Sequence, residues 1–370
     1  MTLSPKSIGD RAPNATKLAL LAAAAAVALS ACQQKSAEAP TAAADANATG
    51  TASAATPVAA EGTSILRLDP ALDAIIPPNA VMEKIGSGFG FVEGPLWYKG
   101  EIWFSDLTGN KLHAIGADGK TRLLIDHSGG KDVIPPGSFQ GSNGMVVDKD
   151  GTVLMERHGA RDIVRVKEDM SIEPFLSKNG EGARFNSPND MIFAPDGALW
   201  ITDPPYGMLG QDKDPAKEAK YNGVYRYKDG KVTAVIKDLP RPNGIGFSPD
   251  GKKLYVANCE PEMFVNVYDV NPDGTVSNGR RFISYPGPNP VDVPDGLKVD
   301  SQGNVWTSGP GGIRIINPEG KVLGQLKSPD RAQANLAWGG DDWKTAYIMG
   351  AGNVYRLRIA IPGEKPLYTK

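Results

Sequence analysis

The chain has 370 residues, of which 40 are basic and 42 acidic. This near balance of charge argues against a nucleic-acid-binding protein, which would carry an excess of Lys and Arg. The 43 glycines and 30 prolines favour a protein of many turns and short strands over one of long helices.

A signal peptide is predicted at residues 1–31. Arg11 and Lys17 are basic, and the apolar run over residues 18–29 is too short to cross a bilayer comfortably but has the length of a signal-peptide core. The run ends in Leu-Ser-Ala-Cys at residues 29–32, which resembles a bacterial lipobox. We therefore expect Cys32 to be the lipidation site. A plain secretory signal with a chance Cys is the alternative.

Residues 32–62 are predicted to form a flexible tether. They are mostly Ala, Thr, Glu, Asn and Pro, so they cannot bury enough apolar surface to offset the entropy of ordering. Gln33 resembles the residue that sorts bacterial lipoproteins to the outer membrane. A folded domain at residues 63–370 is thus expected at the periplasmic face of that membrane, held by its lipid alone. A secreted or periplasmic location is the alternative.

Six similar segments follow along the chain. Each begins with a carboxylate or amide residue, then a strand, a turn with Gly or Asp, and a second strand. Dipeptides such as Asp150-Gly151 and Asp196-Gly197 mark the turns, because Gly readily adopts positive φ. The first residues of the six segments are Glu93, Asn143, Asn189, Asn243, Asp295 and Asn335.

This repeat predicts an all-β fold, a six-bladed β-propeller with four-stranded blades. The segments start 40 to 54 residues apart, a spacing close to that of propeller repeats, and further strand-like pieces between them complete each blade. A pair of β-sandwiches with coincidental turns is the alternative. A strand near residues 65–66 or 81–85 is expected to pair with the last blade and close the ring.

The six leading residues are expected to meet at the channel, because the innermost strand of each propeller blade lines it. Their side chains would form a ring of hard oxygen ligands without His or Cys, which favours Ca²⁺, with Mg²⁺ or Mn²⁺ as alternatives and Zn²⁺ a weaker one. The other interpretation is that each residue merely caps a loop entering a strand.

At residues 85–359 the chain resembles the gluconolactonase, regucalcin and luciferin-regenerating-enzyme family. The resemblance lies in residues 91–97 (FVEGPLW), 187–190 (SPND), 241–244 (RPNG) and 294–296 (PDG). Residues 202–207 (TDPPYG) recur in bacterial lactonase members. The resemblance implies that Glu93, Asn243 and Asp295 are metal ligands and that Asn189 is a further oxygen donor. Asn143 and Asn335 are expected to contact either substrate or water.

The resemblance also implies a metal-dependent lactonase, in which a cation polarises the lactone carbonyl and a base activates water. Asp295 is the expected base, with Asp190 and Asp203 as alternatives. The other interpretation of Asp190, which the residues favour slightly, is a buried carboxylate that bonds backbone amides. His158 is expected to act as a base, to contact substrate, or to be structural. Tyr206 is expected to form part of the pocket wall.

The predicted activity is hydrolysis of a sugar lactone or similar small ester, a carboxylic ester hydrolase reaction. Two alternatives remain from the sequence. One is an organophosphate hydrolase of the diisopropyl-fluorophosphatase type using the same site, and the other is a non-catalytic calcium-binding or scaffold propeller. The expected partners are a small substrate and, through the lipid only, a membrane, with no nucleic acid.

Overall fold

Short antiparallel strands make up almost all of the regular structure. The computed structural model describes residues 57–287 and 292–369. The predicted signal peptide, Cys32 and most of the tether lie outside the described residues, and those predictions stay open. The described residues belong to one unit, residues 55–370. None of the helices within the described ranges is long and apolar enough to cross a membrane.

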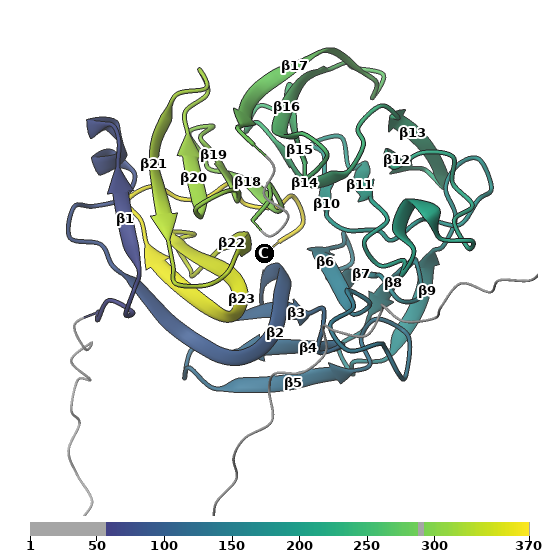
Figure 1. Ribbon diagram of the computed structural model, residues 1–370, viewed down its shortest axis with the longest axis horizontal. Helices are drawn as coiled ribbons and strands as arrows, with labels where there is room; N and C mark the ends of the chain where they lie inside the picture. The colour runs from purple at the N-terminus through teal and green to yellow at the C-terminus, as the bar shows by residue number, and fades with distance from the viewer. Residues whose placement is uncertain (1–56, 288–291, 370) are drawn as a thin grey trace, which may run out of the picture. The chain divides into compact units, whose positions relative to one another are not determined.

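Three four-stranded sheets follow one another along the chain. They contain β6 (Ser142–Val147), β7 (Val153–Arg157), β8 (Asp162–Val166) and β9 (Ile172–Leu176); β10 (Met191–Phe193), β11 (Leu199–Asp203), β12 (Gly223–Lys228) and β13 (Lys231–Ile236); and β14 (Pro242–Phe247), β15 (Lys253–Asn258), β16 (Met263–Val270) and β17 (Val276–Tyr285). Figure 1 shows them arranged radially, with β6, β10 and β14 nearest the centre.

Two larger sheets complete the ring. The five-stranded sheet has the order β1 (Ser64–Arg67), β21 (Val322–Lys327), β20 (Ile313–Ile316), β19 (Val305–Thr307) and β18 (Leu297–Val299). The six-stranded sheet has the order β22 (Gln333–Gly339), β23 (Thr345–Arg358), β2 (Met82–Tyr98), β3 (Glu101–Asp106), β4 (Lys111–Ile115) and β5 (Thr121–Asp126). Two short 3₁₀ helices are η1 (Pro70–Ala74) and η2 (Gln211–Lys213).

The β-propeller prediction is confirmed, but the prediction of six separate four-stranded blades is wrong. The described strands form five hydrogen-bonded sheets. The physical reason is the length of β2, whose residues 82–91 pair with β23 while its residues 92–98 pair with β3. The first and last repeats therefore share one continuous sheet.

Ring closure was predicted correctly for one of the two segments proposed. Met82 pairs with Leu357 and Ser87 with Asn353, so the start of β2 joins β23 from the last repeat. The segment around Ile65 instead pairs with β21, which belongs to the fifth repeat. The pairing of β2 with β23 therefore closes the ring of sheets.

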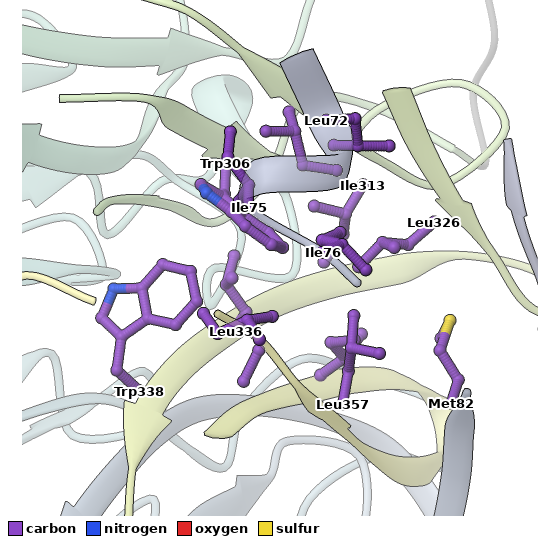
Figure 2. Packing of buried hydrophobic residues seen from close by; sticks show 14 of the residues in the cluster. Leu72, Ile75, Ile76, Met82, Trp306, Ile313, Leu326, Leu336, Trp338 and Leu357 are labelled. Atoms are coloured by element: carbon purple, nitrogen blue, oxygen red, sulfur yellow. The ribbon is translucent and has the colours of Figure 1, made fainter. Parts of the chain in front are cut away.

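Apolar side chains pack between neighbouring sheets, and one cluster lies beside the ring closure. In Figure 2, Trp306 of β19 and Trp338 of β22 approach one another, and Leu336 and Leu357 lie close by. The two indole rings meet edge to face at 5.0 Å between centroids, a favoured aromatic geometry. The Trp306 indole N–H donates to Asp300 Oδ2 at 2.9 Å, so burial of this ring leaves no polar group without a partner.

Candidate functional site

A cavity of about 130 Å³ opens at one end of the inner strands. Seven of the residues predicted from the sequence line it: Glu93, Asn143, His158, Asn189, Tyr206, Asn243 and Asp295. They come from the first five repeats, and five of the six repeat-leading residues that were predicted to converge line the cavity. Three other predicted residues, Asn335, Asp190 and Asp203, are not among its lining residues, and Cys32 is outside the described residues.

Close contact between inner strands brings these side chains together. The backbone N–H of Gly144 donates to Asn189 O at 3.1 Å, that of Gly244 to Asp295 O at 2.9 Å, and that of Gly296 to Ala334 O at 2.7 Å. A Cβ on Gly244 would lie 2.4 Å from Asp295 O, and one on Gly296 would lie 2.0 Å from the Asn335 side chain. Glycine is therefore sterically required after Asn243 and Asp295, whereas Asn189 and Asn335 are followed by Asp190 and Leu336.

Glu93 of β2 presents one carboxylate oxygen to the cavity. Its Oε2 accepts from the Asn335 Nδ2 at 2.8 Å and from the Gly94 backbone N–H. Its buried Oε1 has no hydrogen-bond partner within the described ranges. Burial, with the charge of Asp190 as a second cause, raises the pKa of Glu93 to about 7.

Asn143 of β6 is held by His158. The His158 Nδ1 lies 2.9 Å from Phe139 O, a carbonyl that can only accept, so Nδ1 carries the proton. Nε2 is then the acceptor for Asn143 Nδ2 at 3.1 Å. The buried Asn143 Oδ1 has no partner among the described side chains and backbone groups. Burial lowers the pKa of His158 to about 4. The Nε2 lone pair already accepts from the Asn143 amide, so this geometry suits His158 to orienting Asn143 better than to abstracting a proton.

Asn243 of β14 has a similar arrangement. Its Nδ2 donates to Cys259 Sγ at 3.2 Å, while its buried Oδ1 has no partner in the part of the chain that the structure describes. Asp295, just before β18, also lies in the cavity wall, and its backbone N–H donates to the Ser308 hydroxyl oxygen at 2.8 Å. Burial and the charge of Glu93 raise the pKa of Asp295 well above its usual range.

Asp190 and Asn335 are joined by a lysine that the sequence reasoning missed. Lys298 Nζ donates to Asp190 Oδ2 at 3.0 Å, to Asn335 Oδ1 at 3.2 Å and to Leu297 O at 3.0 Å. Asp190 Oδ1 accepts the backbone N–H of Met191 at 3.0 Å. Asp190 is therefore paired below the cavity, which matches its structural interpretation. The only sequence signal for Lys298 is a charged residue in an otherwise apolar inner strand.

Asp203 and Tyr206 occupy different surroundings. The Asp203 carboxylate accepts the backbone N–H groups of Asn186 and Ser187, each at 2.8 Å, and so fixes the loop that leads to Asn189. Burial raises the pKa of Asp203 to about 7. Tyr206 lines the cavity as predicted.

The free oxygens fit a hard cation. Glu93 Oε1, Asn143 Oδ1 and Asn243 Oδ1 are all buried without partners in the described structure, and an unpaired buried oxygen is costly. Oxygen ligands of this kind suit Ca²⁺. No cluster of three His, Cys, Asp or Glu side chains with metal-ligand geometry occurs in the described residues, and two of the three free oxygens belong to amides.

A second cavity of about 330 Å³ lies further along the same inner strands. Its walls are mainly apolar, and the tail at residues 364–367 borders it. Tyr368 packs edge to face on Phe193, with 4.8 Å between ring centroids. The tail therefore crosses this end of the inner strands. Lining residues from the inner strands include Leu96, Met145, Met191, Ile245, Val299 and Ala337.

The fold and site define a β-propeller with an oxygen-lined pocket at one end of its inner strands. The chain belongs to the SMP-30/gluconolactonase/LRE-like family, whose model matches residues 91–352. It is 36% identical over 307 residues to a gluconolactonase from Zymomonas mobilis, covering 80% of this chain and 85% of that one. It is 25% identical over 298 residues to a putative sugar lactone lactonase from Rhizobium meliloti, covering 76% and 92%.

Among solved structures, the chain is similar to a gluconolactonase from Xanthomonas campestris. The TM-score is 0.71 at 29% identity, covering 84% of this chain and 99% of that one.

Proposed function

We propose that the protein hydrolyses a sugar lactone or a similar small ester with the help of a bound divalent cation, Ca²⁺ in the first instance. The observation that carries the proposal is the set of three unpartnered buried oxygens on Glu93, Asn143 and Asn243, which face the cavity beside Asp295. The names of the relatives from Zymomonas mobilis and Xanthomonas campestris support a lactone as the substrate class.

Glu93, Asn189, Asn243 and Asp295 are the proposed ligands, and Asn143 adds a further amide oxygen. A bound cation would supply Lewis acidity to the lactone carbonyl and would stabilise the negative charge that develops on its oxygen. Without a cation, burial holds the pKa of Glu93 at about 7. A nearby positive charge favours the ionised form of both carboxylates, so the loaded site suits a carboxylate base.

Asp295 is the proposed base. It lies in the cavity wall, and its carboxylate can take the proton from an attacking water and return it to the departing alkoxide. Asn143 is held by His158 so that its oxygen faces the reaction space. Apolar side chains at the wall, among them Phe91 and Phe139, limit the access of bulk water and strengthen the polar contacts inside.

The test is the hydrolysis of glucono-δ-lactone by the purified full-length protein. The rate is monitored as acid release and corrected for spontaneous hydrolysis. Turnover should stop on EDTA treatment and return with Ca²⁺. Asp295→Asn should lower the rate constant by at least about a hundredfold, within the range of general acid–base catalysis. Asp273→Asn, the same change at an exposed turn, should keep wild-type activity. Equal turnover with and without EDTA would contradict the proposal that hydrolysis needs a bound cation.

We further propose that Cys32 is acylated after cleavage of residues 1–31 and that residues 32–62 tether the folded domain to the lipid. The domain would then reside at the periplasmic face of the outer membrane. The lipobox resemblance at residues 29–32 supports this. Cys32→Ser should move the protein from the membrane fraction to the soluble fraction of the cells that express it. Retention of this variant on the membrane would contradict lipid anchoring.

A further inference from the structure

Cys259 follows β15 and is fully buried at the wall of the cavity. It is the only cysteine among the described residues, and it has no disulfide partner there. Its backbone N–H donates to Arg241 O at 3.2 Å, which places the side chain beside the first residues of β14. A buried cysteine without a disulfide commonly acts as a small hydrophobic residue.

The Cys259 sulfur makes hydrogen bonds on two sides, and the Tyr206 side chain also interacts with it. It accepts from Asn243 Nδ2 at 3.2 Å, and its S–H donates to Pro294 O at 3.0 Å. A carbonyl oxygen can only accept, so the contact with Pro294 O places the thiol hydrogen on the side of the sulfur that faces Pro294. Because the hydrogen points to Pro294, the sulfur lone pairs face the Asn243 amide.

This arrangement selects one of the two orientations of the Asn243 amide. The oxygen and nitrogen of an amide have nearly the same size, and hydrogen-bond partners decide which way the group points. With the amide nitrogen on sulfur, Oδ1 faces the cavity without another partner in the described structure. In the reversed orientation, an N–H₂ group would face the proposed cation and would repel it.

We infer that Cys259 is a positioning residue that presents the Asn243 oxygen to a cation. The inference rests on the proposed function. The same sulfur contacts Pro294, the residue before Asp295, so one side chain also ties the fourth repeat to the segment that carries the proposed base. Partners that orient metal ligands in this way typically contribute tenfold to a hundredfold to metal affinity.

The test compares Cys259→Ala with Cys259→Ser in the EDTA-treated full-length protein. Calorimetric titration with CaCl₂ gives the affinity, and thermal unfolding without Ca²⁺ checks folding. Serine retains a donor and an acceptor, whereas alanine retains neither. We expect Cys259→Ala to raise the Ca²⁺ dissociation constant at least about tenfold, and Cys259→Ser to recover most of that loss. If Cys259→Ala does not fold, Cys259→Val, which keeps the volume without the hydrogen bonds, replaces it.

Lactone hydrolysis as a function of Ca²⁺ concentration adds a second readout. The concentration of Ca²⁺ for half-maximal turnover should rise in Cys259→Ala, with the rate at saturating Ca²⁺ changing less. Equal Ca²⁺ affinity in the wild type and Cys259→Ala would overturn the inference alone. An equal loss of Ca²⁺ affinity in the alanine and serine variants would indicate that Cys259 acts through packing alone. A wild type that neither binds Ca²⁺ nor hydrolyses lactone would overturn the proposed function as well.

Discussion

Lys298 offers the sharpest test of how the site is supported. Replacing it with Met removes three N–H donors and leaves the Asp190 carboxylate, whose side chain is only 5% exposed, without its ion-pair partner. Breaking a buried ion pair costs about 3–5 kcal/mol. The Lys298 side chain is 21% exposed, so we expect about 3 kcal/mol, the lower end of that range. For a chain of this size, the melting temperature should fall by roughly 6 °C.

The assay is thermal unfolding of Lys298→Met, with Lys253→Met as the matched control. Lys253 pairs with Asp269 at a half-exposed site, where the two side chains are 41% and 32% exposed, and loss of such a solvent-accessible pair costs about 1 kcal/mol or less. The double variant Asp190→Asn/Lys298→Met carries no buried charge at this position, so it should recover much of the lost stability. Equal melting temperatures for the two lysine variants, or no recovery in the double variant, would refute the reasoning.

Three further predictions follow from the same contacts. Burial lowers the pKa of His158 from 6.5 to about 4. The neutral side chain therefore stabilises the fold above pH 6.5, and this contribution is lost as the pH falls toward 4. In urea unfolding, the difference in unfolding free energy between the wild type and His158→Gln should shrink by about 2 kcal/mol between pH 7 and pH 5. Because Ca²⁺ requires ionised carboxylates and the pKa of Glu93 is raised to about 7, calorimetric Ca²⁺ affinity should fall as the pH decreases below 7, with protons released on binding; a pH-independent affinity would count against Glu93 as a ligand. Tyr368→Ala removes an edge-to-face contact with Phe193 and should cost about 1 kcal/mol of unfolding free energy, while the rate of lactone hydrolysis stays unchanged.

The sequence predicted the ring of oxygen donors because equivalent positions in a propeller repeat face the same axis. Glu93, Asn143 and Asn243 could therefore be placed together without coordinates, and the structure does place them around one cavity. The sheet count was wrong because the length of β2 depends on its pairing with the distant β23. Repeat spacing contains no information on such a pairing.

The supporting contacts could not be predicted in the same way. Lys298 meets Asp190 across 108 positions of sequence, and Cys259 meets Pro294 across 35. Neither residue occupies the leading position of a repeat, so the repeat pattern that predicts the oxygen ring gives no information about them. The His158 bond to Asn143 likewise turns a residue predicted as a possible base into one that orients an amide.

The choice of amides over carboxylates has a physical reason in this channel. Each additional buried carboxylate would raise the pKa of its neighbours, as the charge of Glu93 already does for Asp295. Asparagine supplies an oxygen ligand without charge, but its other end is an N–H₂ group that must be directed away from a cation. A ring built on asparagine therefore needs an acceptor behind each amide nitrogen. His158 accepts from the amide nitrogen of Asn143, and Cys259 accepts from that of Asn243. Two side chains of unrelated chemistry therefore leave the oxygens of these two amides without another partner at the cavity wall.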